Sequence, residues 1–97
     1  MPTSRDPRLS DQQFALIARA LAEPRRFQIL EQIGKCEAAL PCAALNDKHE
    51  ISAATMSHHL KELETAGLID VTRSGKTMSM TVNRPILRAY LDRLARI

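Results

Sequence analysis

Residues 52–67 read Ser-Ala-Ala-Thr-Met-Ser-His-His-Leu-Lys-Glu-Leu-Glu-Thr-Ala-Gly, and the rest of the chain is organised around this stretch. Its large apolar residues are Met56, Leu60 and Leu63. Their spacing places them on one face of an α-helix. Ser52 can cap the first turn of this helix, and Gly67 can adopt the left-handed conformation that commonly ends one. The sequence therefore predicts an amphipathic helix here.

The opposite face of this helix, with its first turn, carries small, hydroxyl and hydrogen-bond-donor side chains. They belong to Ser52, Ala54, Thr55, Ser57, His58 and Lys61. Small side chains allow a helix to approach DNA closely, hydroxyl groups bind phosphates or base edges, and lysine supplies positive charge. An ordinary solvated helix face has a similar composition. The composition of this helix alone therefore does not distinguish a helix that binds DNA from an ordinary surface helix.

Length and composition indicate one globular domain. The chain has 97 residues, of which 44% are hydrophobic and 26% charged. Its net charge of +3 is too small to establish a nucleic-acid partner by itself. There is no apolar run long enough to span a bilayer and no recognisable cleavable leader. We therefore expect a cytoplasmic protein with no membrane association, no cofactor and reduced cysteines.

Four helical segments occupy most of the chain up to Gly67. Residues 1–9 contain two prolines and no periodicity, and are predicted to form a flexible tail before a single domain over residues 10–97. The predicted helices cover about 10–22, 24–34, 41–48 and 52–67, and residues 35–40 are predicted to be a plain connection. The third and fourth helices, joined by a short turn, have the helix-turn-helix arrangement.

After Gly67 the apolar period changes from that of a helix to that of a strand. Apolar and polar residues alternate on both sides of Ser74-Gly75, which predicts a β-hairpin with these two residues as its turn. Arg73 and Lys76 then lie at its tip. A last helix should follow from residue 83 or 84. The predicted fold is mainly α with a small β-hairpin: a winged helix-turn-helix of four helices, two strands and a final helix.

Three stretches of the chain match one known pattern. Residues 20–30, Ala-Leu-Ala-Glu-Pro-Arg-Arg-Phe-Gln-Ile-Leu, introduce the second predicted helix. Residues 56–63, Met-Ser-His-His-Leu-Lys-Glu-Leu, are followed by Ala-Gly-Leu-Ile at 66–69. Residues 73–76, Arg-Ser-Gly-Lys, form the predicted wing tip. In this order they resemble the ArsR/SmtB family of bacterial metal- and stress-responsive repressors, over most of residues 12–95.

The resemblance implies a homodimer whose first and last helices form the interface, with one recognition helix for each half-site. The apolar stripes of these helices support the same expectation, because together they exceed what a monomer usually exposes. The residues expected at this interface are Phe14, Ile17, Leu21, Leu87, Tyr90, Leu91 and Leu94. The alternative is that both stripes close one intramolecular core.

These observations predict a sequence-specific regulator that binds double-stranded DNA, specifically a homodimeric repressor on an inverted repeat with an unknown inducer. Thr55, Ser57, His58 and Lys61 are expected to face base edges and phosphates, with Ser52 adding a phosphate contact and Ala54 setting the closeness of approach. Arg73 and Lys76 should hold the backbone or minor groove. Arg25 or Arg26 is a further candidate for a phosphate contact, with a surface ion pair as the alternative.

Two cysteines, Cys36 and Cys42, are the candidates for a sensing role. The Cys-x-Cys pair that many relatives use for metal is absent around Cys42, and the last helix has no histidine. Cys36, Cys42 and His49 are the only nearby soft ligands, and their spacing fits no known metal site. Cys36 and Cys42 are close enough in sequence for a thiol switch. The alternative is that Cys42 is a small apolar side chain and Cys36 an incidental loop thiol.

Two further interpretations concern the histidine pair and the class of protein. His58 and His59 point about 100° apart on a helix and do not readily chelate one ion; His58 is expected to face DNA and His59 to be structural. No phosphate-binding glycine loop or nucleophile motif occurs, so we do not expect an enzyme. A winged helix used as a protein-interaction module remains the alternative to DNA binding.

Overall fold

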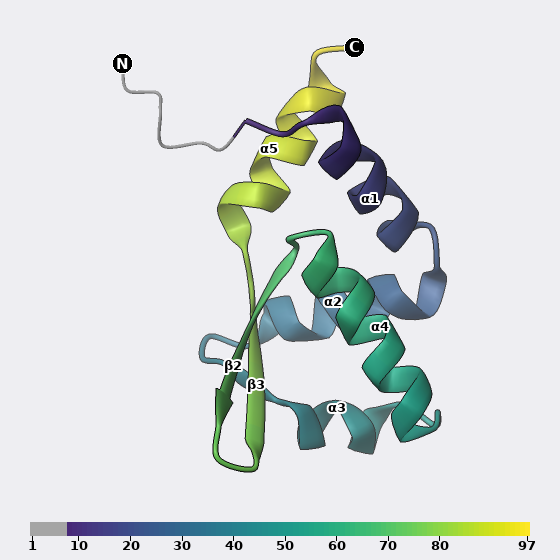
Figure 1. Cartoon of the computed structure of the whole chain (residues 1–97), viewed down its shortest axis with the longest axis vertical. Coiled ribbons are helices and arrows are strands. Elements are labelled where there is room, and N and C mark those ends of the chain that lie inside the picture. Colours follow the sequence, from purple (N-terminus) through teal and green to yellow (C-terminus); the bar gives the residue numbers. More distant parts are fainter. Residues whose placement is uncertain (1–7) are drawn as a thin grey trace.

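The computed structural model describes residues 8–97, so most of the predicted tail at 1–9 lies outside the described residues. The elements are α1 (Asp11–Leu21), α2 (Pro24–Lys35), β1 (Leu40–Pro41), α3 (Cys42–Lys48), α4 (Ala53–Thr65), β2 (Ile69–Ser74), β3 (Thr77–Val82) and α5 (Arg84–Ala95). This order confirms the winged helix-turn-helix prediction (Figure 1). None of these helices is long and apolar enough to cross a membrane.

The side chains predicted to cap the N-termini of α1, α4 and α5 do so in the structure. The Oγ atom of Ser10 accepts a hydrogen bond from the backbone N–H of Gln13 at 3.0 Å. Asn83 caps α5 in the same way, with 3.2 Å between its Oδ1 atom and the amide of Ile86. A capping side chain satisfies one of the amides that the first helical turn leaves without a partner.

The sheet contains one strand more than the sequence predicted. Its strand order is β1-β3-β2, and the short β1 pairs Leu40 with Met80 inside the segment expected to be a plain connection. That prediction was wrong because two residues carry no visible alternation. The hairpin turn was also misplaced by one residue: Ser74 pairs with Thr77, so Gly75 and Lys76 form the turn. Gly75 has a φ of +60°, which glycine adopts without steric cost.

One apolar core lies beneath the helices and the sheet. Its fully buried members include Ile17, Ile29, Ile33, Leu45, Met56, Leu63, Leu68 and Met80. They come from α1, α2, α3, α4, the α4–β2 connection and β3. The positions of α3 and α4 are therefore set by a core that they share with the other elements, and not only by the turn that joins them.

α1 and α5 pack against each other within the single chain. The rings of Phe14 and Tyr90 have their centroids 4.9 Å apart. The guanidinium of Arg93 lies 4.3 Å from the centre of the Phe14 ring and forms a 2.7 Å ion pair with Asp11. Tyr90 is buried and Ile17 is fully buried inside this chain. These two side chains thus belong to the intramolecular core, and only the remaining stripe residues are available to a partner.

Different elements lie at the two ends of the molecule. Figure 1 shows α1 and α5 at one end, and the start of α4, α3 and the tip of the hairpin at the other. The start of the predicted recognition helix and the tip of the wing thus lie away from the two helices predicted to form the dimer interface (Figure 1).

Candidate nucleic-acid interface

The structure confirms which side of α4 is buried and which side faces solvent. Met56, Leu60 and Leu63 are buried in the core. The side chains predicted to contact DNA are all exposed: Ser52, Ala54, Thr55, Ser57, His58 and Lys61. The helix therefore presents a continuous row of small, hydroxyl and cationic groups to solvent, and its position is set by the apolar side that it buries.

The first turn of α4 is built around two hydroxyl groups. The Oγ atom of Ser52 accepts from the backbone N–H of Thr55 at 3.0 Å and donates to Thr55 Oγ1 at 2.9 Å. The Thr55 hydroxyl then keeps its own proton for an outside acceptor. A helix N-terminus also favours anions, because its first amides point outward without helical partners. This end of α4 is suited to a phosphate oxygen.

The wing tip supplies exposed positive charge at the same end of the molecule. Arg73 and Lys76 are both exposed. Arg73 pairs with Met78 and lies on the same face of the hairpin as Val71, because side chains alternate along a strand. The Thr77 hydroxyl closes the turn by donating to the carbonyl oxygen of Ser74 at 2.7 Å. The two cations are thus carried at the tip of the hairpin, at the same end of the molecule as the start of α4 (Figure 1).

Arg26 does not face solvent, so of the two arginines predicted to add a phosphate contact it is excluded, and for Arg25 the contact stays a prediction. Arg26 is 8% exposed and donates from Nε to the carbonyl oxygen of Ala20 at 2.8 Å. Its NH1 atom lies 3.3 Å from Nδ1 of His59, on the buried side of α4. The structural role predicted for His59 is therefore observed. Burial lowers the pKa of His59, and the positive charge of Arg26 lowers it further.

Arg25 makes a parallel contact to the turn between α3 and α4. Its NH1 atom lies 3.1 Å from Nδ1 of His49, whose Nε2 atom lies 2.9 Å from Oε1 of Gln32. Burial, followed by the charge of Arg25, lowers the pKa of His49. Both ring nitrogens of His49 thus have hydrogen-bond partners within the chain. The sequence did not predict these hydrogen bonds, because Arg25 and His49 lie far apart in the chain and belong to no recognisable motif.

The two cysteines flank β1. Cys36 follows the last residue of α2, and Cys42 is the first residue of α3. Both thiols are free and partly buried, and both pack against the core. The apolar packing predicted for Cys42 is therefore present, whereas a redox role for the pair stays a prediction. Within residues 8–97, no group of three or more His, Cys, Asp or Glu side chains is placed to hold a metal ion.

Known proteins share the helix-turn-helix part of this chain. The model of a family described as a helix-turn-helix domain matches residues 21–72, which include α2, α3 and α4. The chain belongs to this helix-turn-helix family.

Two bacterial regulators are similar over most of the chain. The HTH-type transcriptional regulator YceK of Bacillus subtilis is 28% identical over 81 residues, which cover 84% of this chain and 81% of the relative. The transcriptional activator HlyU of Vibrio cholerae is 28% identical over 82 residues, covering 84% and 74% of the two chains.

Solved structures of bacterial regulators share the fold of this chain. The homodimeric winged helix-turn-helix domain Mb0332 of Mycobacterium bovis, a possible ArsR-family regulator, superposes with a TM-score of 0.69 at 24% identity. The match covers 91% of this chain and 87% of that one. Other ArsR-type structures superpose with TM-scores of 0.76 and 0.80 at 22% and 20% identity, which shows the shared fold. The chain is a transcriptional regulator with a winged helix-turn-helix DNA-binding domain.

Proposed function

We propose that this protein is a homodimeric repressor that binds an inverted repeat, with α4 of each protomer in the major groove. The observation that carries the proposal is the exposed donor face of α4 together with an exposed basic wing tip, since the start of α4 and the tip lie at the same end of the molecule, away from α5 (Figure 1). A helix that reads base edges and a neighbouring wing that holds the backbone divide recognition into specific and non-specific parts.

Within this proposal each exposed side chain has a role. Ser57, His58 and Lys61 face base edges and adjacent phosphates, and Ala54 lets the helix approach the groove floor. Thr55 takes the phosphate contact through the proton that its pairing with Ser52 leaves free. Ser52 holds the geometry of the cap. Arg73 and Lys76 bind the backbone or the minor groove, where positive charge releases condensed counterions.

The proposed dimer surface consists of apolar side chains that this chain leaves uncovered. Phe27 of α2 is 44% exposed, and Leu91 and Leu94 of α5 are 54% and 39% exposed. Leu21 and Leu87 line the apolar groove between α2 and α5 next to Phe27 and Leu91. Large apolar side chains gathered around this groove favour a partner surface. The homodimeric relative from Mycobacterium bovis supports a second copy as that partner.

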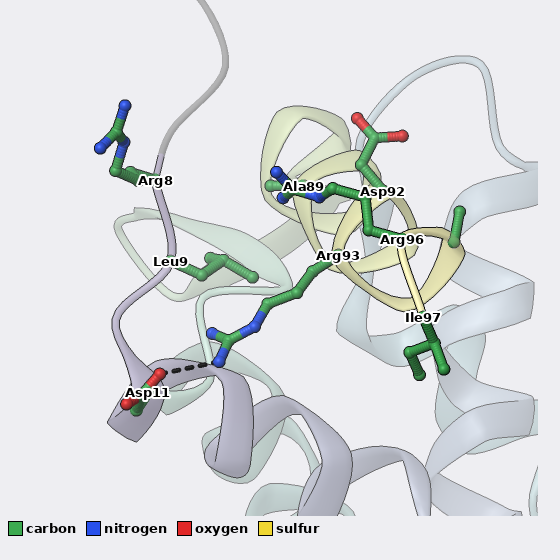
Figure 2. Close-up of a pocket in the computed structure, with 9 residues that line it drawn as sticks. Arg8, Leu9, Asp11, Ala89, Asp92, Arg93, Arg96 and Ile97 are labelled. Carbon is green, nitrogen blue, oxygen red and sulfur yellow. Dashed lines mark hydrogen bonds and ion pairs between the residues drawn. The ribbon is translucent and has the colours of Figure 1, made fainter.

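The end of α5 is held in a fixed orientation for such an interface. Figure 2 shows Arg93 reaching from α5 to Asp11 at the start of α1, across a hollow that Leu9 and Ile97 also line. An exposed ion pair contributes little stability by itself, but the guanidinium also rests on the Phe14 ring. α1 and α5 therefore present the exposed apolar residues of α5 as one surface.

Fluorescence anisotropy tests the proposal directly. The full chain is titrated against the DNA upstream of its own gene and against a scrambled duplex, over a salt series in reducing buffer. We expect tighter binding to the upstream DNA and an affinity that falls steeply with salt. Absence of binding to either duplex at low salt would refute the proposal and favour a protein partner for the exposed face of α4.

Two further arms of the same titration address regulation. Mild oxidation before the titration tests Cys36 and Cys42: loss of binding, reversed by reductant, would make them a thiol sensor, and unchanged binding would leave them core thiols. A reporter gene under the bound promoter tests repression. Expression should rise when the regulator is deleted, whereas a fall would make the protein an activator, as HlyU is named.

A further inference from the structure

Two consecutive arginines at the start of α2 reach two buried histidines of the DNA-reading motif. Arg25 contacts His49 in the turn between α3 and α4, with 3.1 Å between NH1 and Nδ1. Arg26 contacts His59 in α4, with 3.3 Å between the corresponding atoms. Both histidines are 8% exposed. One further side-chain hydrogen bond described between α2 and this turn joins Oε1 of Gln32 to Nε2 of His49, at 2.9 Å.

The arginines dictate the protonation of both imidazoles. A guanidinium has only donors, so the Nδ1 atom that faces it must be an acceptor and the ring must be neutral. The proton then lies on Nε2, and for His49 this atom is 2.9 Å from the acceptor Oε1 of Gln32. The three side chains thus form a consistent donor–acceptor series. A protonated ring would instead place an N–H group and a positive charge against each guanidinium.

We propose that Arg25 and Arg26 are positioning residues that hold the helix-turn-helix motif on α2 only while His49 and His59 are neutral, so that acidification weakens DNA binding. The inference rests on the proposed DNA-binding function. It assigns these four residues a role behind α4, whereas the residues that contact DNA lie on its other side.

The surroundings of each histidine support this sign. His59 faces the cations Arg26 and Arg25 from α2 and neighbouring His58, and Glu23 at the N-cap of α2 is the one carboxylate that favours its protonation. His49 faces Arg25 and the uncharged amide of Gln32. Burial and these positive charges lower the pKa of both histidines.

Arg26 is itself anchored on α1. Its Nε and NH2 atoms donate to the carbonyl oxygens of Ala20 and Arg19, at 2.8 and 3.4 Å. These carbonyls belong to the last turn of α1, which lacks helical donors of its own. The guanidinium therefore has a fixed position before it meets His59. A fixed donor can define where α4 sits, whereas a mobile surface arginine cannot.

The test compares asparagine variants with wild type across pH. Asparagine carries an acceptor near the position of Nδ1 but does not titrate in this range. Binding of the full chain to its upstream DNA is measured from pH 7.5 to 5.5 at constant ionic strength. We expect the affinity of a His58→Asn protein to fall by about fivefold or more, the lower end of a typical coupling between a conformational equilibrium and a binding site. The same protein carrying His49→Asn and His59→Asn should change less than about twofold.

The His58→Asn background leaves only the two histidines of the proposed pairs in the chain. His58 is exposed on the proposed DNA-facing side of α4, so it is not part of either pair. A second variant, His59→Leu, removes the acceptor. If the pairs position α4, His59→Leu should lose more affinity at pH 7.5 than His59→Asn while its circular dichroism stays helical. Equal affinities of these two variants, or equal pH slopes with and without the asparagines, would overturn the proposal.

A measurement without DNA separates this inference from the proposed function. Two-bond proton–nitrogen NMR spectra at pH 7.5 should show the Nε2–H form of His49 and His59. Backbone amides of α4 should shift with the same midpoint as His59 when the pH is lowered. The Nδ1–H form, or titration of His59 without movement of α4, would refute the positioning role. Failure to bind DNA at any pH would refute the proposed function, whichever NMR result is obtained.

Discussion

The charged residues nearest to the recognition helix serve two different purposes, and burial separates them. Lys61 and Arg73 are exposed and free to meet phosphates, whereas Arg26 is buried and spends its donors on carbonyl oxygens and on His59. Removing a buried donor leaves each acceptor without a partner, which costs more than the hydrogen bond itself contributes.

Arg26→Ala should therefore destabilise the fold without acting on DNA charge. We expect a loss of about 2–4 kcal/mol in the free energy of unfolding, measured by urea denaturation. Arg88→Ala is the matched control, since Arg88 is exposed on α5 and should change stability by no more than about 0.5 kcal/mol. Similar losses in the two variants would contradict the buried network.

Gly67 is a position where the backbone requires glycine. Its φ is +84°, and an added Cβ atom would lie 2.7 Å from Nε2 of Gln13. Gly67→Ala should cost roughly 1–2 kcal/mol through the left-handed conformation alone. Gly34→Ala is the control: its Cβ atom would meet Val82 at an ordinary 3.5 Å, inside a helix where alanine is favoured. A thermal melt in which both variants are equally stable would contradict this prediction.

Stability should also depend on pH through the buried histidines. The pKa values of His49 and His59 are lowered in the folded chain, so the unfolded chain binds more protons below the ordinary histidine pKa of about 6.5. Their contribution to stability is complete above that pH and is lost as the pH falls toward the folded pKa values. Urea midpoints measured from pH 8 to 5 should decrease, and the decrease should be smaller in the His49→Asn, His59→Asn double variant.

At the scale of elements, the helices were predictable and the sheet only partly so. The caps at Ser10 and Ser52 and the stripe of Met56, Leu60 and Leu63 are local signals, and the structure confirms them. β1 escaped prediction because a two-residue strand exists only through its partner β3. The same limit hid the arginine–histidine pairs, whose members meet across elements. Exposure of the DNA-facing side chains followed from helical period, whereas their contacts with DNA remain a proposal.

The recognition helix and the wing should respond differently to substitution. Lys76→Ala removes a backbone charge, so it should weaken binding to all sequences alike and reduce the salt slope by about one. His58→Ala removes a side chain proposed to face base edges, so it should reduce the preference for upstream over scrambled DNA. Anisotropy titrations with both duplexes separate the two effects. Identical behaviour of the two variants would contradict the assignment of base recognition to α4 and of backbone binding to the wing.

At the scale of the whole molecule, α1 connects the proposed dimer end to the DNA-reading end. Phe14 packs on Tyr90 of α5, and the Nε2 atom of neighbouring Gln13 donates to the carbonyl oxygen of Ala66 at the end of α4. The last carbonyls of α1 hold Arg26, which meets His59. The spacing of two recognition helices in a dimer therefore depends on packing that is already present within each chain.

Leu91→Glu tests the dimer and its link to DNA binding together. Leu91 is 54% exposed on α5, so a carboxylate there is tolerated by a single chain but would be buried without a partner between two. The variant should sediment as a monomer, remain helical, and lose binding to the inverted repeat, because one half-site supplies only part of the contacts. Arg88→Glu is the matched control, with the same new side chain at another exposed position of α5. It should remain a dimer, and an unchanged sedimentation profile for Leu91→Glu would remove α5 from the interface.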